Sequence, residues 1–322
     1  MLNLTKYLTL FSLGFLPRIK PVFFIVLLFT PFCNISKAQE NLLPNGSFEE
    51  YIICPEDGAL NKAKYFSSPT NSSPDYFNSC AMASNNTSIP SNLGGFQEPR
   101  SGSSYAGIVT YSYGNNYKEY IQTSLVKTLE SNKYYLVKYF VSLGSYSSTA
   151  SNKLGVFFSE QLITENINTT LLFEDNLHTD SIISDTLNWV ELSFIYQAKG
   201  NENFLLLGNF HDDFFTDTLN CSSGIGDNYY YIDDISVMEM DVNVPNVITP
   251  NSDGINDVLE IEDLTGDFEI TIVNRWGQKV FQTNNLTLNS WNGENFPEGV
   301  YFYTLTDKKN VINKTGFIHL IR

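Results

Sequence analysis

The feature that most constrains this chain is a succession of short runs rich in Val, Ile, Tyr, Phe and Thr, separated by Gly, Asn, Ser and Pro. In WVELSFIYQA, residues 189–198, Val190, Leu192 and Phe194 alternate with polar or smaller residues, as in a strand with one buried face. NFLLLGNF, residues 203–210, is more uniformly apolar and suits a strand that is covered on both sides. Together with the scarcity of helical periodicity, this pattern predicts an all-β chain.

The predicted strands fall into two regions. The first region also contains apolar runs at 105–111, 134–143, 153–159 and 229–239, separated by turn signals, which indicates a two-sheet sandwich. The stretch around 242–245 ends it. The last 80 or so residues have their own alternation, with a turn at 274–277, and predict a small Ig-like antiparallel β-sandwich. The expected boundaries are 1–38, 39–241 and 242–322.

Residues 1–38 have the features of a signal peptide. Arg18 and Lys20 precede the apolar run PVFFIVLLFTPF, and Ser36 and Ala38 form a small-x-small cleavage site. The run is shorter than the roughly 20 residues that a spanning helix needs. We therefore expect cleavage after Ala38 and no transmembrane segment in the mature chain; an uncleaved anchor is the alternative.

The charge balance bears on the partners of the protein. The expected leader holds four basic residues and no acidic ones, so its removal takes the net charge from −16 to about −20. Nucleic acid needs a basic surface, so we exclude it as a partner. In an oxidising compartment two of the three remaining cysteines should pair. We predict a Cys54–Cys80 disulfide because both lie in Pro- and Asn-rich surroundings close in sequence, which leaves Cys221 as the odd cysteine.

The stretch TPNSDGINDVLE, residues 249–260, could be a calcium loop or a turn. Gly254 at the sixth position of an EF-hand-like loop puts Glu260 at the twelfth, but it puts Thr249 at the first, where a carboxylate is wanted. Asn251 and Asp253 can instead bind their own backbone, and Gly254 permits positive φ. Turn chemistry is therefore the preferred interpretation.

Five blocks in the last region together resemble a known family. They are VPNVITPNSDGINDVLEI, FEITIVNRWGQKVFQ, WNG, PEGVYFYTLT and GFIHLIR. In this order they resemble the gliding-motility-associated C-terminal domain of Bacteroidetes, the type B sorting domain of the type IX secretion system. The resemblance implies export through the periplasm and the type IX secretion machinery to the outer-membrane surface or the medium. It also implies that the domain serves as an address and not as a catalyst.

The first region is similar to galactose-binding-like jelly rolls, the fold of many carbohydrate-binding modules. The similarity lies in NLLPNGSFEEY at its start and YYYIDDISVME at its end, with PSNLGGFQEPRSGSSYAGI between them. It implies a jelly-roll sandwich and a structural calcium near the joined termini. Glu49 and Asp233 are the acidic residues that match those strands. The alternative is that both carboxylates satisfy loop amides or face solvent.

Candidate ligand residues lie in TYSYGNNYKEY, residues 110–120. Tyr111, Tyr113 and Tyr117 could stack on sugar rings, with Arg100 as a polar contact. The alternatives are packed tyrosines and a loop salt bridge. No HExxH motif, GxSxG motif or phosphate-binding glycine loop is present.

We therefore expect a non-catalytic protein that binds carbohydrate or another cell-envelope component. The alternatives are an adhesin-like surface protein without sugar binding, or a polysaccharide hydrolase with an unrecognised carboxylate pair.

Overall fold

The computed structural model describes residues 40–322, except 175, 222–226, 262–267, 286–289 and 309–310. The expected leader, residues 1–38, lies outside the described residues. Strands dominate the described part, with two short 3-10 helices, η1 (Leu60–Lys62) and η2 (Asp213–Phe215). None of the described helices is long and apolar enough to cross a membrane. The expectation of an all-β chain is confirmed.

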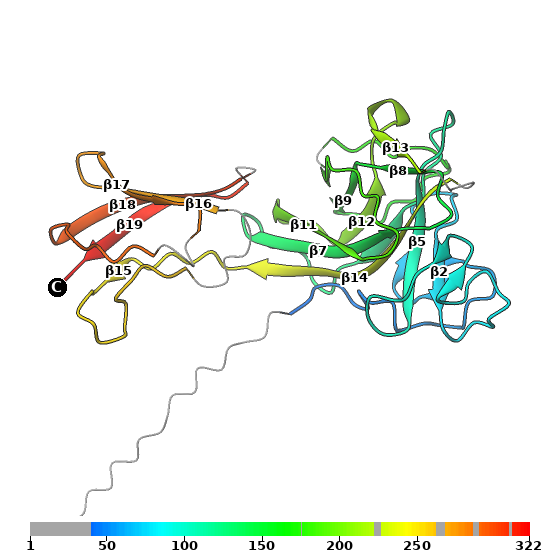
Figure 1. Cartoon of the computed structure of the whole chain (residues 1–322), viewed down its shortest axis with the longest axis horizontal. Coiled ribbons are helices and arrows are strands. Elements are labelled where there is room, and N and C mark those ends of the chain that lie inside the picture. Colours follow the sequence, from blue (N-terminus) through cyan, green and yellow to red (C-terminus); the bar gives the residue numbers. More distant parts are fainter. Residues whose placement is uncertain (1–39, 175, 222–226, 262–267, 286–289, 309–310) are drawn as a thin grey trace, which may run out of the picture. The chain divides into compact units, whose positions relative to one another are not determined.

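Two five-stranded antiparallel sheets form the first region (Figure 1). The strand order of one sheet is β1 (Phe66–Ser67), β6 (Ile121–Ser124), β12 (Phe204–Asn209), β9 (Leu154–Ser159) and β10 (Leu177–His178). The order of the other is β11 (Val190–Gln197), β7 (Tyr134–Leu143), β14 (Asn228–Met240), β5 (Ser104–Tyr111) and β2 (Asp75–Asn78). Neighbouring strands are far apart in sequence, as a jelly-roll topology requires.

Side chains from both sheets meet in one apolar core, which makes the region a sandwich. Leu205 and Val156 from one sheet pack in the same cluster as Val137, Tyr230 and Ile232 from the other. On β11, Leu192 and Phe194 are buried while Glu191 and Ser193 are exposed, as the alternation predicts.

The apolar strand β12 is covered on both sides, as predicted. Leu205 and Leu207 belong to the core between the sheets, whereas Leu206 packs on the opposite face against Tyr120 and Phe210.

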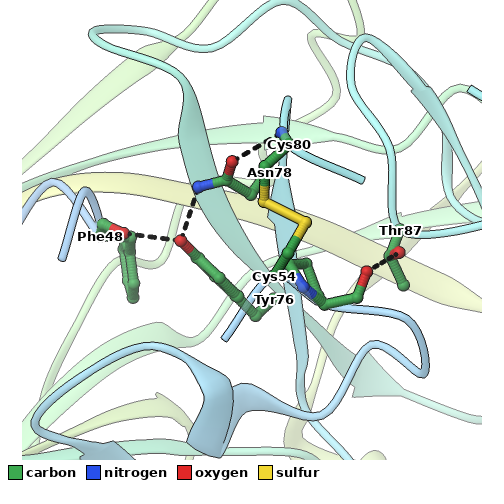
Figure 2. The surroundings of a disulfide bond; sticks show 7 residues. Phe48, Cys54, Tyr76, Asn78, Cys80 and Thr87 are labelled. Atoms are coloured by element: carbon green, nitrogen blue, oxygen red, sulfur yellow. Dashed lines mark hydrogen bonds between the residues drawn. A yellow bond between two sulfur atoms is a disulfide. The ribbon is translucent and has the colours of Figure 1, made fainter. Parts of the chain in front are cut away.

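Short ribbons and a disulfide complete the first region. The ribbons pair β3 (Ser91–Asn92) with β4 (Gly95–Phe96) and β8 (Thr149–Ser151) with β13 (Thr218–Asn220). The predicted Cys54–Cys80 disulfide is present, and Cys221 is free. Figure 2 shows the disulfide beside the Tyr76 hydroxyl, which donates a hydrogen bond to the carbonyl of Phe48 at 3.0 Å. The crosslink therefore ties the first loops of the chain to strand β2.

The last region forms a five-stranded sheet. Its order is β15 (Val247–Ile248), β19 (Asn313–Leu320), β18 (Gly299–Asp307), β16 (Phe268–Val273) and β17 (Lys279–Thr283). All its pairs are antiparallel except β15 with β19, which is parallel and was not expected from the sequence. The predicted turn joins β16 to β17, where the N–H of Gly277 donates to the carbonyl of Asn274 at 2.9 Å. Ile270, Leu305, Ile318 and Trp291 fill its core.

Candidate functional site

The predicted tyrosine segment begins at the end of β5 and runs into a loop. Tyr111 is the last residue of β5, and the Lys118 ammonium lies 5.2 Å from its ring centroid. Tyr113, two residues further on, has 91% of its side-chain surface exposed. A large apolar ring this exposed contributes little to the fold, so it is available to a ligand.

A second loop is bound tightly to the first. The N–H of Asp213 donates to the Asn116 side-chain oxygen at 2.8 Å, and the N–H of Asn116 donates back to the Asp213 carboxylate at 3.2 Å. The ammonium of the fully buried Lys118 pairs with the same carboxylate at 2.5 Å. Burial lowers the pKa of Lys118, and the hydrogen bond and charge of Asp213 oppose this. These three contacts fix the position of η2.

The second loop presents two further exposed aromatic residues. Phe214 is 89% exposed and Phe215 is 62% exposed, and their rings meet edge to face with centroids 5.0 Å apart. We call Tyr113, Phe214 and Phe215 the aromatic loop patch. The sequence analysis missed the two phenylalanines, because only the contacts of Asp213 show that their loop joins the tyrosine loop. The one available signal was the adjacent pair of aromatics in NFHDDFF.

Tyr117 points away from this patch. Its hydroxyl donates to the Glu119 carboxylate at 2.8 Å, and its ring is partly buried. The structure therefore separates Tyr117 from Tyr113 and places it beside a different feature, a pocket with two acidic residues.

Arg100, Glu49 and Asp233 come together at one loop, residues 100–104. The buried Asp233 accepts hydrogen bonds from the N–H groups of Arg100 at 3.0 Å and Ser101 at 3.2 Å. Glu49 accepts from the N–H of Ser103 at 2.8 Å and from the hydroxyls of Ser103 and Ser104. The Arg100 guanidinium pairs with Asp234 and lies 3.7 Å above the ring centroid of Phe140. Its contacts are those of a loop salt bridge.

These contacts bear on the expected calcium. Burial and then the neighbouring Asp234 raise the pKa of Asp233 to about 8, although backbone hydrogen bonds from Ser101 oppose this. Among the described residues, no group of three or more His, Cys, Asp and Glu side chains is placed to hold a metal ion. The surroundings of Glu49 and Asp233 suit carboxylates that close a loop better than carboxylates that hold a cation. The calcium site stays a prediction, without support from the described residues.

A pocket of about 350 Å³ lies over β2, β5 and β14, which are neighbours in one sheet. Three carboxylates line it, those of Asp75, Glu119 and Asp227. The Glu119 carboxylate accepts from the N–H of Val109 at 2.8 Å and from the hydroxyls of Tyr117 and Ser73. Asp75 on β2 accepts from the Tyr229 hydroxyl at 2.6 Å. Its backbone is paired with Gly107, two residues before Val109 on the same face of β5, so both acids lie along one strand.

A glycine allows the contact between Tyr229 and Asp75. A Cβ at Gly107 would lie 2.1 Å from the Tyr229 hydroxyl oxygen, which no side chain can tolerate. The missing side chain leaves the space through which Tyr229 reaches across β5. Gly107 therefore has a packing role in the pocket and is not needed for an unusual φ.

The two pocket acids both hold protons more tightly than usual. Burial raises the pKa of Asp75 to about 6, and the hydrogen bond from Tyr229 opposes this. Burial, and then repulsion from Asp75, raise the pKa of Glu119 to about 8, while the N–H of Val109 and the hydroxyl of Tyr117 oppose this. The sequence analysis named no residue of such a pair, because Asp75 and Glu119 meet only through strand pairing.

The stretch at 249–260 is a hydrogen-bonded turn. The Asp257 carboxylate accepts from the N–H groups of Asn251 at 2.9 Å, Ser252 at 2.6 Å and Gly254 at 2.8 Å. These backbone hydrogen bonds, led by that of Gly254, lower the pKa of Asp257. Gly254 has a φ of 82°, as the turn interpretation requires.

Three solved structures are similar to this chain. Each match covers nearly the whole of the solved structure and about two thirds of this chain. The CBM22-1 xylan-binding domain of Xyn10C from Paenibacillus barcinonensis has 14% identity, covers 65% of this chain and 99% of its own, and has a TM-score of 0.35. TmCBM61 in complex with β-1,4-galactotriose has 11% identity, covers 62% and 99%, and has a TM-score of 0.30. The Stig cyclase Fisc from Fischerella sp. TAU has 10% identity, covers 63% and 98%, and has a TM-score of 0.39.

Similarities this low carry no argument about function. A comparison with curated proteins finds no match. The family model of the CHU_C type IX secretion signal domain matches residues 242–320, which contain four of the five sequence blocks, most of the fifth and the five-stranded sheet described above. Residues 242–320 of this chain are therefore a type IX secretion signal domain.

Proposed function

We propose that this is a non-catalytic binding protein of the cell surface or medium, whose jelly roll binds carbohydrate or another cell-envelope component. The observation that carries this proposal is the aromatic loop patch. Tyr113, Phe214 and Phe215 expose apolar rings on two loops that Asp213 holds together. Aromatic faces stack on the apolar faces of sugar rings, and a preformed surface loses little entropy on binding.

Glycan-array binding and affinity electrophoresis of the purified protein test the proposal. We expect Tyr113→Ala or Phe214→Ala to weaken glycan retention about tenfold or more, since each removes one stacking surface. Phe96→Ala is the matched control, because Phe96 is also an exposed aromatic residue, 55% exposed, but lies on the β3–β4 ribbon.

The second candidate function is an adhesin-like protein that contacts other proteins and binds no sugar. The same exposed rings would then form the centre of a protein interface. A folded protein that retains no glycan, but loses adhesion to cells in the Phe214→Ala variant, would support this alternative and contradict the first proposal.

Export is tested separately. Deletion of residues 242–322 should leave the protein in the periplasm of a bacterium that has a type IX secretion system, measured by cell fractionation and surface protease treatment. The role of the domain as the export signal would be refuted if the truncated protein still reached the surface.

A further inference from the structure

The acidic pocket contains carboxyl groups that have no positively charged partner within the described part of the chain. Among the described residues, no Lys, Arg or His forms an ion pair with Asp75 or Glu119. Asp227 also lines the pocket, so a third carboxylate adds negative potential. The Tyr229 hydroxyl donates to Oδ2 of Asp75, while Oδ1 lies close to Gly58. Within the described residues, the donors to Asp75 and Glu119 are therefore hydroxyls and one backbone N–H, and none of them brings a positive charge.

A second buried glutamate shows how the fold neutralises such a group when it serves structure alone. Glu202 is 3% exposed, as is Glu119, and also accepts from a tyrosine hydroxyl, that of Tyr196 at 2.6 Å. Three backbone N–H groups, at residues 199–201, complete its hydrogen bonds. Burial raises the pKa of Glu202, but these donors outweigh it and the pKa is lowered. Glu119 has one backbone donor and a second acid beside it.

The opening of the pocket decides what can supply the missing positive charge. The pocket is bordered by Leu93, 41% exposed, and Tyr146, 56% exposed, so it is open to a ligand from solvent. The hydroxyl-bearing residues Ser73 and Ser147 also line it. A metal ion is disfavoured, because no described group of three or more acidic, His or Cys side chains is placed to hold one. An ammonium group brings three N–H donors and one positive charge, and needs no such set of ligands.

We propose that this pocket binds the primary ammonium group of a small polar ligand, with Asp75 and Glu119 as its acceptors. An amino sugar and a free polyamine share this chemistry. The site is separate from the aromatic loop patch, because none of the residues that line the pocket belongs to the patch. Its occupation would make the protein selective for deacetylated over acetylated amines.

Binding should release protons. At pH 7 Glu119 is largely protonated, and the hydroxyls of Tyr117 and Ser73 donate to it. The other titratable groups that line the pocket are Asp75, Asp227 and Tyr229. A bound ammonium favours the ionised form of the acids around it, so Glu119 loses its proton on binding. An acetylated amine has no charge and would cause no release.

Isothermal titration calorimetry tests the proposal with three probes: a glucosamine tetramer, its fully N-acetylated form and spermidine. Titrations at pH 7 in two buffers with different ionisation enthalpies measure the released protons. We expect at least one of the two amine probes to bind with proton release, and the acetylated tetramer to bind at least tenfold more weakly than the glucosamine tetramer. Comparison of the glucosamine tetramer with spermidine shows whether the site takes amino sugars or free polyamines.

Variants assign the binding to the pocket. Glu119→Gln keeps an acceptor for the N–H of Val109 but removes the ionisable carboxyl group. Asp75→Asn likewise keeps an acceptor for the Tyr229 hydroxyl. Each variant should weaken amine binding about tenfold or more. Glu202→Gln is the matched control and should leave amine binding unchanged. The proposal is overturned if neither amine probe binds, if acetylated and free amines bind equally, or if folded Glu119→Gln and Asp75→Asn proteins retain full affinity.

Discussion

Removal of the Cys54–Cys80 crosslink should destabilise the jelly roll by an amount that the structure allows us to work out. The two cysteines are 26 residues apart. In the chain-entropy description, closing a loop of this length in the unfolded state contributes about 3.5 kcal/mol at 25 °C. Cys54 is only partly buried and Cys80 is exposed, so replacing both sulfur atoms should remove little packing. The double variant Cys54→Ser/Cys80→Ser should therefore lose about this much stability.

Urea unfolding followed by tryptophan fluorescence measures the loss directly. A loss of about 3.5 kcal/mol corresponds to a decrease in Tm of roughly 10 °C for a unit of about 200 residues. Cys221→Ser is the control, because Cys221 is free and its replacement leaves the crosslink intact. A loss below about 1 kcal/mol in the double variant would refute the reasoning, since it would mean that the crosslink hardly restricts the unfolded chain.

Three further predictions concern buried groups. The pKa of Asp233 is raised to about 8 in the folded protein, whereas in the unfolded chain Asp233 ionises near its ordinary value of 3.8. Stability should therefore fall as pH rises from about 4 to about 8. Urea unfolding at pH 5 and pH 8 should show a smaller fall for Asp233→Asn than for the unmodified protein. Gly107→Ala should displace the Tyr229 hydroxyl, lower the Tm and weaken amine binding in the pocket, and unchanged values would contradict the packing argument. Leu206→Ala should cost about 2–5 kcal/mol because the side chain is fully buried, while Leu187→Ala, at an 83% exposed position, should cost almost nothing by the same unfolding measurement.

The C-terminal region shows how far local sequence can predict structure. The turn predicted at 274–277 joins β16 to β17, the strands on either side of it. Strand alternation and turn residues act over a few positions, so they can be read without knowing the fold. The parallel pairing of β15 with β19 could not be read in this way, because it joins residues about 70 positions apart.

The candidate sites also differ in whether local sequence or the pairing of distant residues determines them. The sequence by itself determined the all-β class and the secretion domain, because each depends on neighbouring residues in order. It also indicated the Cys54–Cys80 pair, which the structure contains. It could not show that the loop of Phe214 and Phe215 joins the loop of Tyr113, since Asn116 and Asp213 make that connection across 97 positions.

The acidic pocket was decided by tertiary structure alone. Asp75 and Glu119 are 44 positions apart, and neither belongs to a motif. They lie along the same strand because β2 pairs with β5 and because Glu119 binds the N–H of Val109. Their raised pKa values follow from burial and mutual repulsion, which exist only once the sheets have packed. Sequence determines which residues can form strands, whereas the pairing of distant strands determines which charged groups share a pocket.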